Sequence, residues 1–331
     1  MRTRFPCGVA VALAAAASGA VAQPAGKSAS PSDYPSRSIR FVVPFTPGGT
    51  VDILARVISP RLSEALGQQV VVDNRGGSAG VIGTEIAARS PPDGYTLMLG
   101  NTASIAINPG LYSKLPYDPV RDFAPVTLVA LAPYVLVVPP SLPARSVKEM
   151  LALARARPGQ LAYASTGNGS VGHLSGELLA FMAGVKLQHV PYKNIGQMMT
   201  ELMSGQVQLL FLGVVSAGPY VRTGKLRALA MSGSKRSSML PETPTVAESG
   251  VRDFEVTGWY GVFVPAGTPP QIVMRLNAEI VRIINGPEVR ERLSSEGADL
   301  VGNTPGQFAA YVKSEVAKWA KVVKLSGARV D

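Results

Sequence analysis

Cysteine is almost absent from this chain of 331 residues: the only one, Cys7, lies in an N-terminal segment typical of export signals. Arg2 and Arg4 precede an uncharged apolar run over residues 7–17, and residues 20–22 (AVA) supply the small-x-small pattern of a signal-peptidase site. The run is shorter than the roughly 20 apolar residues that span a bilayer. We therefore predict a signal peptide over residues 1–22, removed before Gln23, and a mature protein in the periplasm.

Loss of this signal leaves a mature chain with no cysteine, which excludes disulfides, thiolate nucleophiles and thiolate metal sites. An exported chain of about 310 residues without disulfides needs large apolar cores, and its length suggests two domains. Hydrophobic residues make up 46% of the chain and charged residues 16%, which indicates a globular, well-buried protein.

Histidines, aromatic residues and long basic runs are also scarce. Only His173 and His189 are present, so a catalytic triad or a histidine-based zinc site has few candidates. The formal charge of +10 falls to +8 without Arg2 and Arg4, no run of lysine and arginine exceeds two residues, and aromatic residues make up 6%. Binding of nucleic acid by a basic patch is therefore not favoured. The acidic residues form no D-x-D or E-x-x-H pattern, and we expect no metal, no cofactor and no catalytic residue.

Short apolar runs alternate with helical patterns along the mature chain. Residues 23–33 are rich in Pro, Ser, Ala and Gly and are expected to form a flexible leader. Beyond them the alternation, with crossovers long enough to hold a helix, is typical of parallel sheets with helices on their faces. The expected strands cover 39–45, 69–73, 96–100, 126–139, 161–165, 187–192, 207–213, 226–232 and 254–265, and the expected helices cover 51–66, 81–88, 147–156, 171–183, 197–203, 217–223, 270–284, 287–295 and 305–325.

Two of the expected strands, 126–139 and 254–265, are long enough to run from one domain into another. A proline-rich stretch over 108–125 is expected to be a long surface connection, and the three C-terminal helices are expected to pack back on the first sheet. We therefore predict an α/β fold of two lobes, joined by two crossing strands, with a hinged cleft between them. The first lobe covers 34–130 and 258–331, and the second lobe, 131–257, is inserted into it.

The first candidate binding loop follows the first expected strand. Ligands of open parallel sheets bind beyond the carboxyl ends of the strands, where loops lead into helices. Two adjacent glycines here let successive N–H groups converge on an anion at the positive end of the next helix. Thr50 offers a hydroxyl group to a ligand or as the N-cap of that helix, and the alternative is a capped turn without a ligand. The expected binding residues of this loop are Phe45, Gly48, Gly49, Thr50 and Asp52.

The second candidate loop, residues 165–173, lies in the expected second lobe. Gly167, Gly169 and Gly172 match the G-x-G-x-x-G pattern of dinucleotide sites, but the next strand ends without the acidic residue that would hold a ribose. The same turn, rich in hydroxyl and N–H groups, suits a carboxylate. His173 either touches the ligand or is satisfied by backbone groups. The expected binding residues of this loop are Ser165, Thr166, Gly167, Gly169, Ser170 and His173.

Further candidates follow other expected strands. Thr102 and Ser104 are expected to contact the ligand or to cap a helix, and Tyr192 ends a strand beside Lys193. Residues 76–80 formally match the G-x-S-x-G nucleophile elbow around Ser78. Both histidines fall in the other expected lobe, so a glycine-rich turn is favoured over an elbow. Without a complete catalytic set, the sequence favours reversible binding over catalysis.

Taken together, these segments resemble the receptors of tripartite tricarboxylate transporters, the Bug family of periplasmic solute-binding proteins. The resemblance extends from about Tyr34 to the C-terminus, and it is specific because of the joint order of its segments. Those segments are Tyr34-Pro35, 39–45 (IRFVVPF), Pro47-Gly48-Gly49 with Asp52, 66–68 (LGQ), 70–75 (VVVDNR), 92–97 (PDGYTL), 115–119 (LPYDP), 189–193 (HVPYK), 224–230 (GKLRALA), 240–245 (LPETPT) and 265–269 (PAGTP).

The resemblance implies a Venus-flytrap receptor that captures a small carboxylate without chemical turnover. Its expected partners are the integral membrane permease subunits of a transporter, or a sensor protein, and a monomer suits such a hinged binder. In the family, backbone and hydroxyl groups of the two glycine-rich loops hold the carboxylate, with the help of waters. These roles carry over to Gly48, Gly49, Thr50, Ser165, Thr166, Gly169, Ser170 and His173.

One segment departs from the family pattern. After Tyr192-Lys193 the family usually has a glycine and then a Pro-Ala pair, whereas this chain has Asn194, Gln197 and Met198. Gln208 also stands where an acidic residue is expected. We hypothesise that this edge of the cleft is enlarged or re-polarised. The alternatives to a transport receptor are an α/β enzyme that uses the glycine loop for a nucleotide, and a receptor that serves signalling only.

Overall fold

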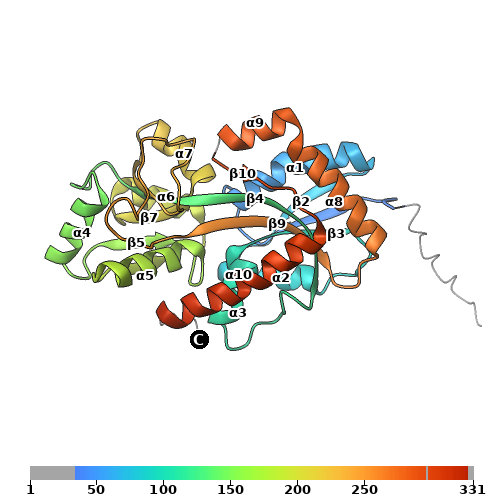
Figure 1. Cartoon of the computed structure of the whole chain (residues 1–331), viewed down its shortest axis with the longest axis horizontal. Helices are drawn as coiled ribbons and strands as arrows, with labels where there is room; N and C mark the ends of the chain where they lie inside the picture. The colour runs from blue at the N-terminus through green and yellow to red at the C-terminus, as the bar shows by residue number, and fades with distance from the viewer. Residues whose placement is uncertain (1–33, 296, 327–331) are drawn as a thin grey trace, which may run out of the picture.

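The computed structural model describes residues 34–295 and 297–326, so the predicted signal peptide and leader lie outside the described residues. Figure 1 shows two lobes, each with helices around strands, and two long strands that run side by side between them. In the described ranges no helix is both long enough and apolar enough to cross a membrane.

The first lobe begins as a β-α-β-α-β unit. Strand β1 (Ile39–Val43) pairs in parallel with β2 (Val70–Asn74) and with β3 (Thr96–Asn101). Helix α1 (Thr50–Leu66) links β1 to β2 and buries Leu54, Ile58 and Leu62, whose spacing places them on one face of the helix. The helix ends at Gly67, whose φ of 68° is a left-handed conformation that glycine adopts without strain. Helix α2 (Val81–Ala88) then leads to β3.

The second lobe repeats this parallel arrangement. Strand β5 (Ala162–Ser165) pairs in parallel with β6 (Gln188–Pro191) and with β7 (Leu209–Gly213). The other strand of this lobe is β8 (Arg227–Met231). Its helices are α4 (Val147–Ala156), α5 (Val171–Ala183), α6 (Ile195–Ser204) and α7 (Val214–Arg222).

The two lobes are joined by the long strands β4 (Phe123–Val138) and β9 (Thr257–Pro265), which pair antiparallel. Strand β4 pairs with β9 as far as Pro133, and from Tyr134 onward it pairs with β7 and β8 of the second lobe. It therefore leaves one sheet and enters the other between Pro133 and Tyr134. Thr257, the first residue of β9, lies opposite Pro133. The predicted α/β fold of two lobes joined by crossing strands is confirmed.

The C-terminal helices return to the first lobe, as predicted. Helix α8 (Pro270–Asn285) packs on α1 and β4, α9 (Pro287–Ser295) follows it, and α10 (Pro305–Ser326) lies along β4 (Figure 1). The short strand β10 (Asp299–Leu300) pairs with β4. Glu315 of α10 accepts hydrogen bonds from the indole N–H groups of Trp259 and Trp319, each at 3.0 Å. This buried carboxylate therefore fixes the C-terminal helix to the crossing strand β9.

The region after β3 differs from the predicted surface connection. A π-helical segment (Thr102–Ile107) continues into the short helix α3 (Asn108–Leu111), which lies inside the stretch 108–125. The Asn101 side chain accepts a hydrogen bond from the Ser104 N–H at 3.0 Å, and the Ser104 hydroxyl accepts one from the Asn101 N–H at 3.1 Å. Helix α10 packs over this segment and buries it. Such burial comes from a distant part of the chain, so local periodicity does not predict it.

Candidate functional site

The loop between β1 and α1 is shaped by a carboxylate behind it. Asp52 accepts hydrogen bonds from the Gly48 N–H (3.0 Å), from Arg56 Nε (2.9 Å) and from Asn74 Nδ2 (3.0 Å). Burial acts to raise the pKa of Asp52, but these hydrogen bonds outweigh burial and hold the pKa below its ordinary value. Gly48 turns the chain with a φ of 92°, which favours glycine. The ionised carboxylate therefore holds the turn in one conformation.

Thr50, at the end of this loop, reaches the other lobe directly. It is the first residue of α1 and Gly49 occupies the N-cap, so the alternative that Thr50 caps the helix is wrong. Thr50 Oγ1 lies 3.1 Å from Ser216 Oγ on α7 of the second lobe. A Cβ atom on Gly213 would lie only 2.4 Å from Thr50 Oγ1, so glycine at that position allows the lobes to approach.

Three hydrogen bonds shape the loop between β5 and α5. Ser165 Oγ accepts from the Gly167 N–H at 3.1 Å, and the Gly169 N–H donates to His173 Nδ1 at 3.0 Å. Ser170 Oγ caps α5 by accepting from the His173 N–H at 3.2 Å. His173 is therefore hydrogen-bonded to the backbone of its own loop. This is the second of the two predicted alternatives, in which backbone groups satisfy the histidine.

Both histidines of the chain form a stacked cluster behind this loop. The ring centroids of His173 and His189 are 4.1 Å apart, and His189 Nε2 lies 2.6 Å from Ser165 Oγ. Burial lowers the pKa of His173, and burial together with the neighbouring His173 lowers the pKa of His189 to about 3. Glu177, 3.9 Å from His173 Nε2, accepts a hydrogen bond from the Tyr163 hydroxyl. An uncharged His173 ring protonated on Nε2 leaves Nδ1 free to accept the Gly169 N–H.

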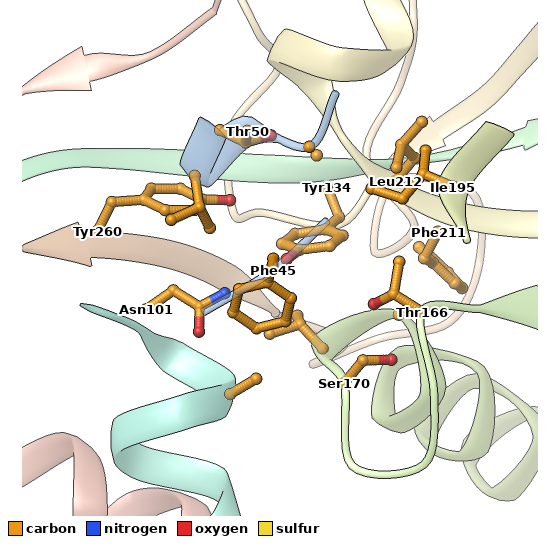
Figure 2. Close-up of a pocket in the computed structure, with 16 residues that line it drawn as sticks. Phe45, Thr50, Asn101, Tyr134, Thr166, Ser170, Ile195, Phe211, Leu212 and Tyr260 are labelled. Carbon is orange, nitrogen blue, oxygen red and sulfur yellow. The ribbon is translucent and has the colours of Figure 1, made fainter. Parts of the chain in front are cut away.

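The two loops face each other across a cavity at the junction of the lobes (Figure 2). Its volume is about 50 Å³, which holds no more than a few waters. The cavity is lined by Phe45, Gly49, Thr50, Val51, Asn101, Ala103, Tyr134, Thr166, Ser170, Val171, Gly172, Ile195, Phe211, Leu212, Gly213 and Tyr260.

None of these lining side chains is charged, and several carry hydroxyl or amide groups that can donate hydrogen bonds. Figure 2 shows Tyr134 and Tyr260, from the crossing strands β4 and β9, beside Thr50 and opposite Thr166. The hydroxyl groups of the two tyrosines interact, and that of Tyr260 also interacts with Thr50. Burial raises the pKa of both tyrosines, so both remain protonated donors at neutral pH. Neutral donors without a neighbouring carboxylate suit an anion, because hydrogen bonds to a charged acceptor are the strong ones.

Comparison with known proteins connects this architecture to a family of receptors. The family model described as "Tripartite tricarboxylate transporter family receptor" matches residues 54–328. BugT of Bordetella pertussis (strain Tohama I) is 39% identical over 298 residues, which cover 90% of this chain and 91% of BugT. The chain belongs to the tripartite tricarboxylate transporter receptor family. The predicted resemblance to this family is therefore confirmed, and so is the prediction of a solute-binding receptor that is not an enzyme.

Solved structures agree with this membership. An R. palustris protein solved with adipate aligns with a TM-score of 0.87 at 40% identity, and the match covers 90% of this receptor and 100% of that chain. MatC from Rhodopseudomonas palustris, solved with bound malate, aligns with a TM-score of 0.84 at 33% identity. This match covers 88% of this receptor and 100% of the MatC chain. Both similarities extend over both lobes of the receptor.

The predicted site residues fall into two layers of the receptor. The cavity lining includes Phe45, Gly49, Thr50, Thr166 and Ser170. A second layer shapes the two loops from behind and consists of Gly48, Asp52, Ser165, Gly167, Gly169 and His173.

The other predicted site residues lie outside the cavity lining. Thr102 Oγ1 accepts from the Trp259 N–H at 2.9 Å, and Ser104 completes the capping box after β3. The Tyr192 hydroxyl donates to Glu201, and burial together with this hydrogen bond raises the pKa of Tyr192 to about 12. These three side chains are buried, and each is hydrogen-bonded to another group of the protein.

Sequence reasoning missed the contribution of the crossing strands to the receptor's cavity. Tyr134 and Tyr260 were not among the predicted contacts, because β4 and β9 were considered only as connections. A polar aromatic residue near the midpoint of each predicted crossing strand is the signal that could have identified them, since such strands pass between the lobes. Ile195, at the start of α6, also lines the cavity without having been predicted.

The departures from the family pattern have structural roles. Asn194 caps α6 by accepting from the Gly196 N–H at 2.7 Å, and Met198 is fully buried in the core. The side-chain oxygen of Gln208 accepts from the Ala162 N–H at 2.9 Å, and Gln197 bonds to Glu201 at 2.8 Å. None of the four lines the cavity between the lobes. The structure therefore gives no support to a re-polarised edge at these positions.

The part of the chain that the structure describes contains no cluster of side chains suited to bind a metal ion. Among residues 34–295 and 297–326, no group of three or more His, Cys, Asp or Glu side chains is placed to hold a metal ion. The residues that line the receptor's cavity supply uncharged hydrogen-bond donors from both lobes.

Proposed function

We propose that this receptor is a periplasmic solute-binding protein that captures a small organic carboxylate in the cavity between its lobes. The observation that carries the proposal is that this cavity is lined from both lobes by hydroxyl and amide groups and by no charged side chain. A carboxylate that leaves water needs such donors to replace its hydration, and each charge-assisted hydrogen bond contributes about 1.5–3 kcal/mol. The adipate and malate bound to two similar proteins are both carboxylates, which supports this class of ligand.

The proposed contacts come from facing loops, so binding and closure are coupled. Gly49 and Thr50 approach the ligand from the first lobe, and Thr166 and Ser170 approach it from the second. Opening would occur where β4 changes sheets, between Pro133 and Tyr134. The lobe boundaries 34–130 with 258–331, and 131–257, belong to this proposal. A ligand that bridges the loops would stabilise the closed arrangement of these two units.

Delivery of the ligand to membrane permease subunits, or to a sensor protein, completes the proposed function, with the receptor acting as a monomer. Export by the predicted signal peptide is part of the same proposal. Mass spectrometry of the protein from a periplasmic fraction is expected to show an N-terminus at Gln23. Recovery of the full chain in the cytoplasmic fraction alone would contradict this part of the proposal.

Ligand binding is tested by calorimetry with linear and branched mono-, di- and tricarboxylates, and with NAD and ATP for comparison. Binding of a carboxylate at about 100 times its Kd is expected to add about 2.7 kcal/mol to the free energy of unfolding. Thr50→Val keeps the shape of the side chain but removes its hydroxyl, so the affinity is expected to fall about 10-fold to 100-fold. Binding of a nucleotide but no carboxylate would overturn the proposal.

Two control variants separate a lost ligand contact from a lost lobe contact. Ser216→Ala removes the partner of Thr50 in the second lobe and leaves the Thr50 hydroxyl in place. Thr200→Val removes an exposed hydroxyl on α6 that bonds to the Gly196 carbonyl, away from the cavity. We expect Thr50→Val to weaken binding more than either control. An equal loss in Ser216→Ala would assign the effect to closure and would contradict a direct contact from Thr50.

A further inference from the structure

A large groove lies behind the hinge that β4 and β9 form, away from the cavity between the loops. Its volume is about 630 Å³, and it is bounded by segments of both lobes and by the crossing strands. We call this space the rear groove. Its lining includes Asp299 and Lys318 of the first lobe, Lys235 and Glu255 of the second, and Pro133 and Thr257 of the crossing strands.

The rear groove and the cavity lie on opposite faces of the crossing strands. Pro133 of β4 is paired with Thr257 of β9, so these two side chains point to the same face. Successive residues of a strand alternate between its two faces. Tyr134 and Tyr260 lie one and three residues further along the chain, so they point to the other face, where they line the cavity. The hinge therefore separates the two spaces.

A hinge motion changes these two spaces in opposite directions. A rotation about the crossing strands that brings the loops together on one face moves the lobes apart on the other face. In the present arrangement the cavity measures about 50 Å³ and the rear groove about 630 Å³. A molecule that contacts both lobes within the rear groove therefore favours the arrangement in which the cavity is closed.

Part of the lining of the rear groove is sheltered from water. Leu131, Pro133 and Tyr311 are half-buried there. Burial and the neighbouring carboxylate of Glu315 raise the pKa of Tyr311, so its hydroxyl group remains a protonated donor at neutral pH. Ion pairs beside such partly buried groups are screened less by salt than ion pairs on an open surface.

Two basic residues of this lining are already paired within the protein. Arg236 Nε lies 3.1 Å from Glu248 Oε2, and Lys318 Nζ lies 3.3 Å from Glu315 Oε1. The Glu315 carboxylate also accepts the two indole N–H groups described above. The charges of these four side chains are therefore compensated before any ligand arrives.

Three other charged side chains of the rear groove have no such partner. Lys235 and Glu255 of the second lobe and Asp299 of the first lobe are exposed. Within residues 34–295 and 297–326, the side chains of these three form no ion pair and no hydrogen bond. The rear groove therefore presents an uncompensated cation on one lobe and uncompensated carboxylates on both lobes.

This distribution of charge discriminates between classes of ligand. A ligand with negative charge alone is repelled by Glu255 and Asp299, and a ligand with positive charge alone is repelled by Lys235. Each charged group of a zwitterion finds an uncompensated partner of opposite sign. The volume of the rear groove also falls within the roughly 300–1,000 Å³ that is typical of small-molecule sites.

We infer that the rear groove is a second binding site, that it binds a zwitterionic amino compound such as a free amino acid or a short peptide, and that this binding promotes closure of the cavity. The carboxylate of the ligand pairs with Lys235 of the second lobe, and its ammonium group pairs with Asp299 of the first. Because the ligand bridges the lobes, it raises the affinity of the cavity for a carboxylate, and the carboxylate raises the affinity of the rear groove by the same factor. The inference goes beyond the proposed function, since it concerns another ligand on the other face of the hinge.

The site is tested by calorimetry on the purified receptor, with the cavity first saturated by a carboxylate that it binds. The probes are straight-chain ω-amino acids of two to eight carbons and alanine peptides of one to four residues, each with its N-acetyl and its amide derivative. We expect at least one probe to bind with a Kd of about 1 mM or tighter, and about fivefold or more tightly than either derivative. If no carboxylate binds the cavity, the same titrations are run without one, so failure of the proposed function leaves this test intact.

Variants of single charges locate the bound probe. Asp299→Asn and Lys235→Met each remove one uncompensated charge, and each should weaken binding of the probe about fivefold or more. Glu242→Gln and Lys148→Met remove exposed charges of the second lobe outside the rear groove, and they should change the affinity by less than about twofold. Absence of binding by every probe, or binding that is unchanged in both Asp299→Asn and Lys235→Met, would overturn the site. Equal binding of an N-acetyl or amide derivative would overturn the zwitterionic class of ligand.

The coupling to closure is tested by titration of the carboxylate in the presence and absence of a saturating probe. The carboxylate is expected to bind about fivefold or more tightly when the probe is present, and Asp299→Asn should abolish this gain. A carboxylate affinity that the probe leaves unchanged or lowers would overturn the coupling.

Discussion

The two loops that face each other across the cavity are held in place by opposite electrostatic means. Behind the first loop, Asp52 is ionised and is compensated by Arg56, Asn74 and the Gly48 N–H. Behind the second loop, His173 is kept uncharged by burial and accepts the Gly169 N–H through its ring. One loop thus depends on a compensated charge and the other on the absence of charge.

This difference shows why the cavity itself can remain neutral. In both loops the ionisable group lies one layer behind the lining, where protein groups satisfy it before any ligand arrives. Backbone turns and short hydroxyl side chains are then left to face the ligand. A fixed charge beside the ligand would have to be desolvated on closure, which is costly unless it is paired.

The largest effect that this difference between the loops predicts is at Asp52. Asp52→Ala leaves the Gly48 N–H, Asn74 and Arg56 without their shared acceptor, so we expect the free energy of unfolding to fall by about 2–4 kcal/mol. Ligand affinity should fall as well, because the turn at Gly48 loses its anchor. Denaturant unfolding measures the first effect, and Glu279→Ala, which removes an exposed ion pair to Arg282, is the control, with an expected loss of at most about 1 kcal/mol. Similar losses in both variants would contradict the special role of Asp52.

Acidification is expected to affect the contributions of the two loops to stability differently. The folded-state pKa values of both histidines are lowered from 6.5, so below that pH the unfolded chain binds protons that the folded protein excludes. Stability is therefore complete above about pH 6.5 and falls as the pH decreases toward 5, by at most about 1.4 kcal/mol per pH unit for each histidine. Asp52 adds nothing in this window, because its lowered pKa keeps its contribution until the pH falls below the unfolded value of 3.8.

The control for this prediction removes both imidazoles. His173→Asn with His189→Gln keeps polar atoms near Nδ1 and Nε2, and the chain contains only these two histidines. Thermal melting of the double variant is expected to show little change between pH 7 and pH 5. If the double variant lost stability as steeply as the wild type, the histidine cluster would not be the source of the pH dependence.

The smallest expected effect concerns the tyrosines of the crossing strands, which belong to neither loop. Tyr260→Phe removes a hydroxyl that interacts with Tyr134 and Thr50, so the free energy of unfolding should fall by about 0.5–1.5 kcal/mol. Ligand affinity should fall too, since one donor of the lining is lost. Calorimetry that shows unchanged affinity would exclude Tyr260 as a ligand contact and confine recognition to the two loops.

Much of the fold was predictable because its signals are local. Helix α5 covers residues 171–183 as predicted, since Ser170 caps its start and Gly184, with a φ of 61°, ends it. The parallel units followed from the alternation of short apolar runs with helical periods. The π-helical segment after β3 was not predicted, because its burial depends on α10, about 200 residues later in the chain.

The sequence by itself determined the secondary structure of each lobe and the two glycine-rich loops, since spacing, caps and left-handed glycines act between near neighbours. Tertiary structure alone decided which side chains of those loops face the cavity. It turned Asp52 and His173 behind the lining, and it brought Tyr134, Tyr260 and Ile195 onto it. The physical reason is that periodicity places a side chain on one side of its own element. The packing of elements that are distant in sequence decides what lies opposite that side.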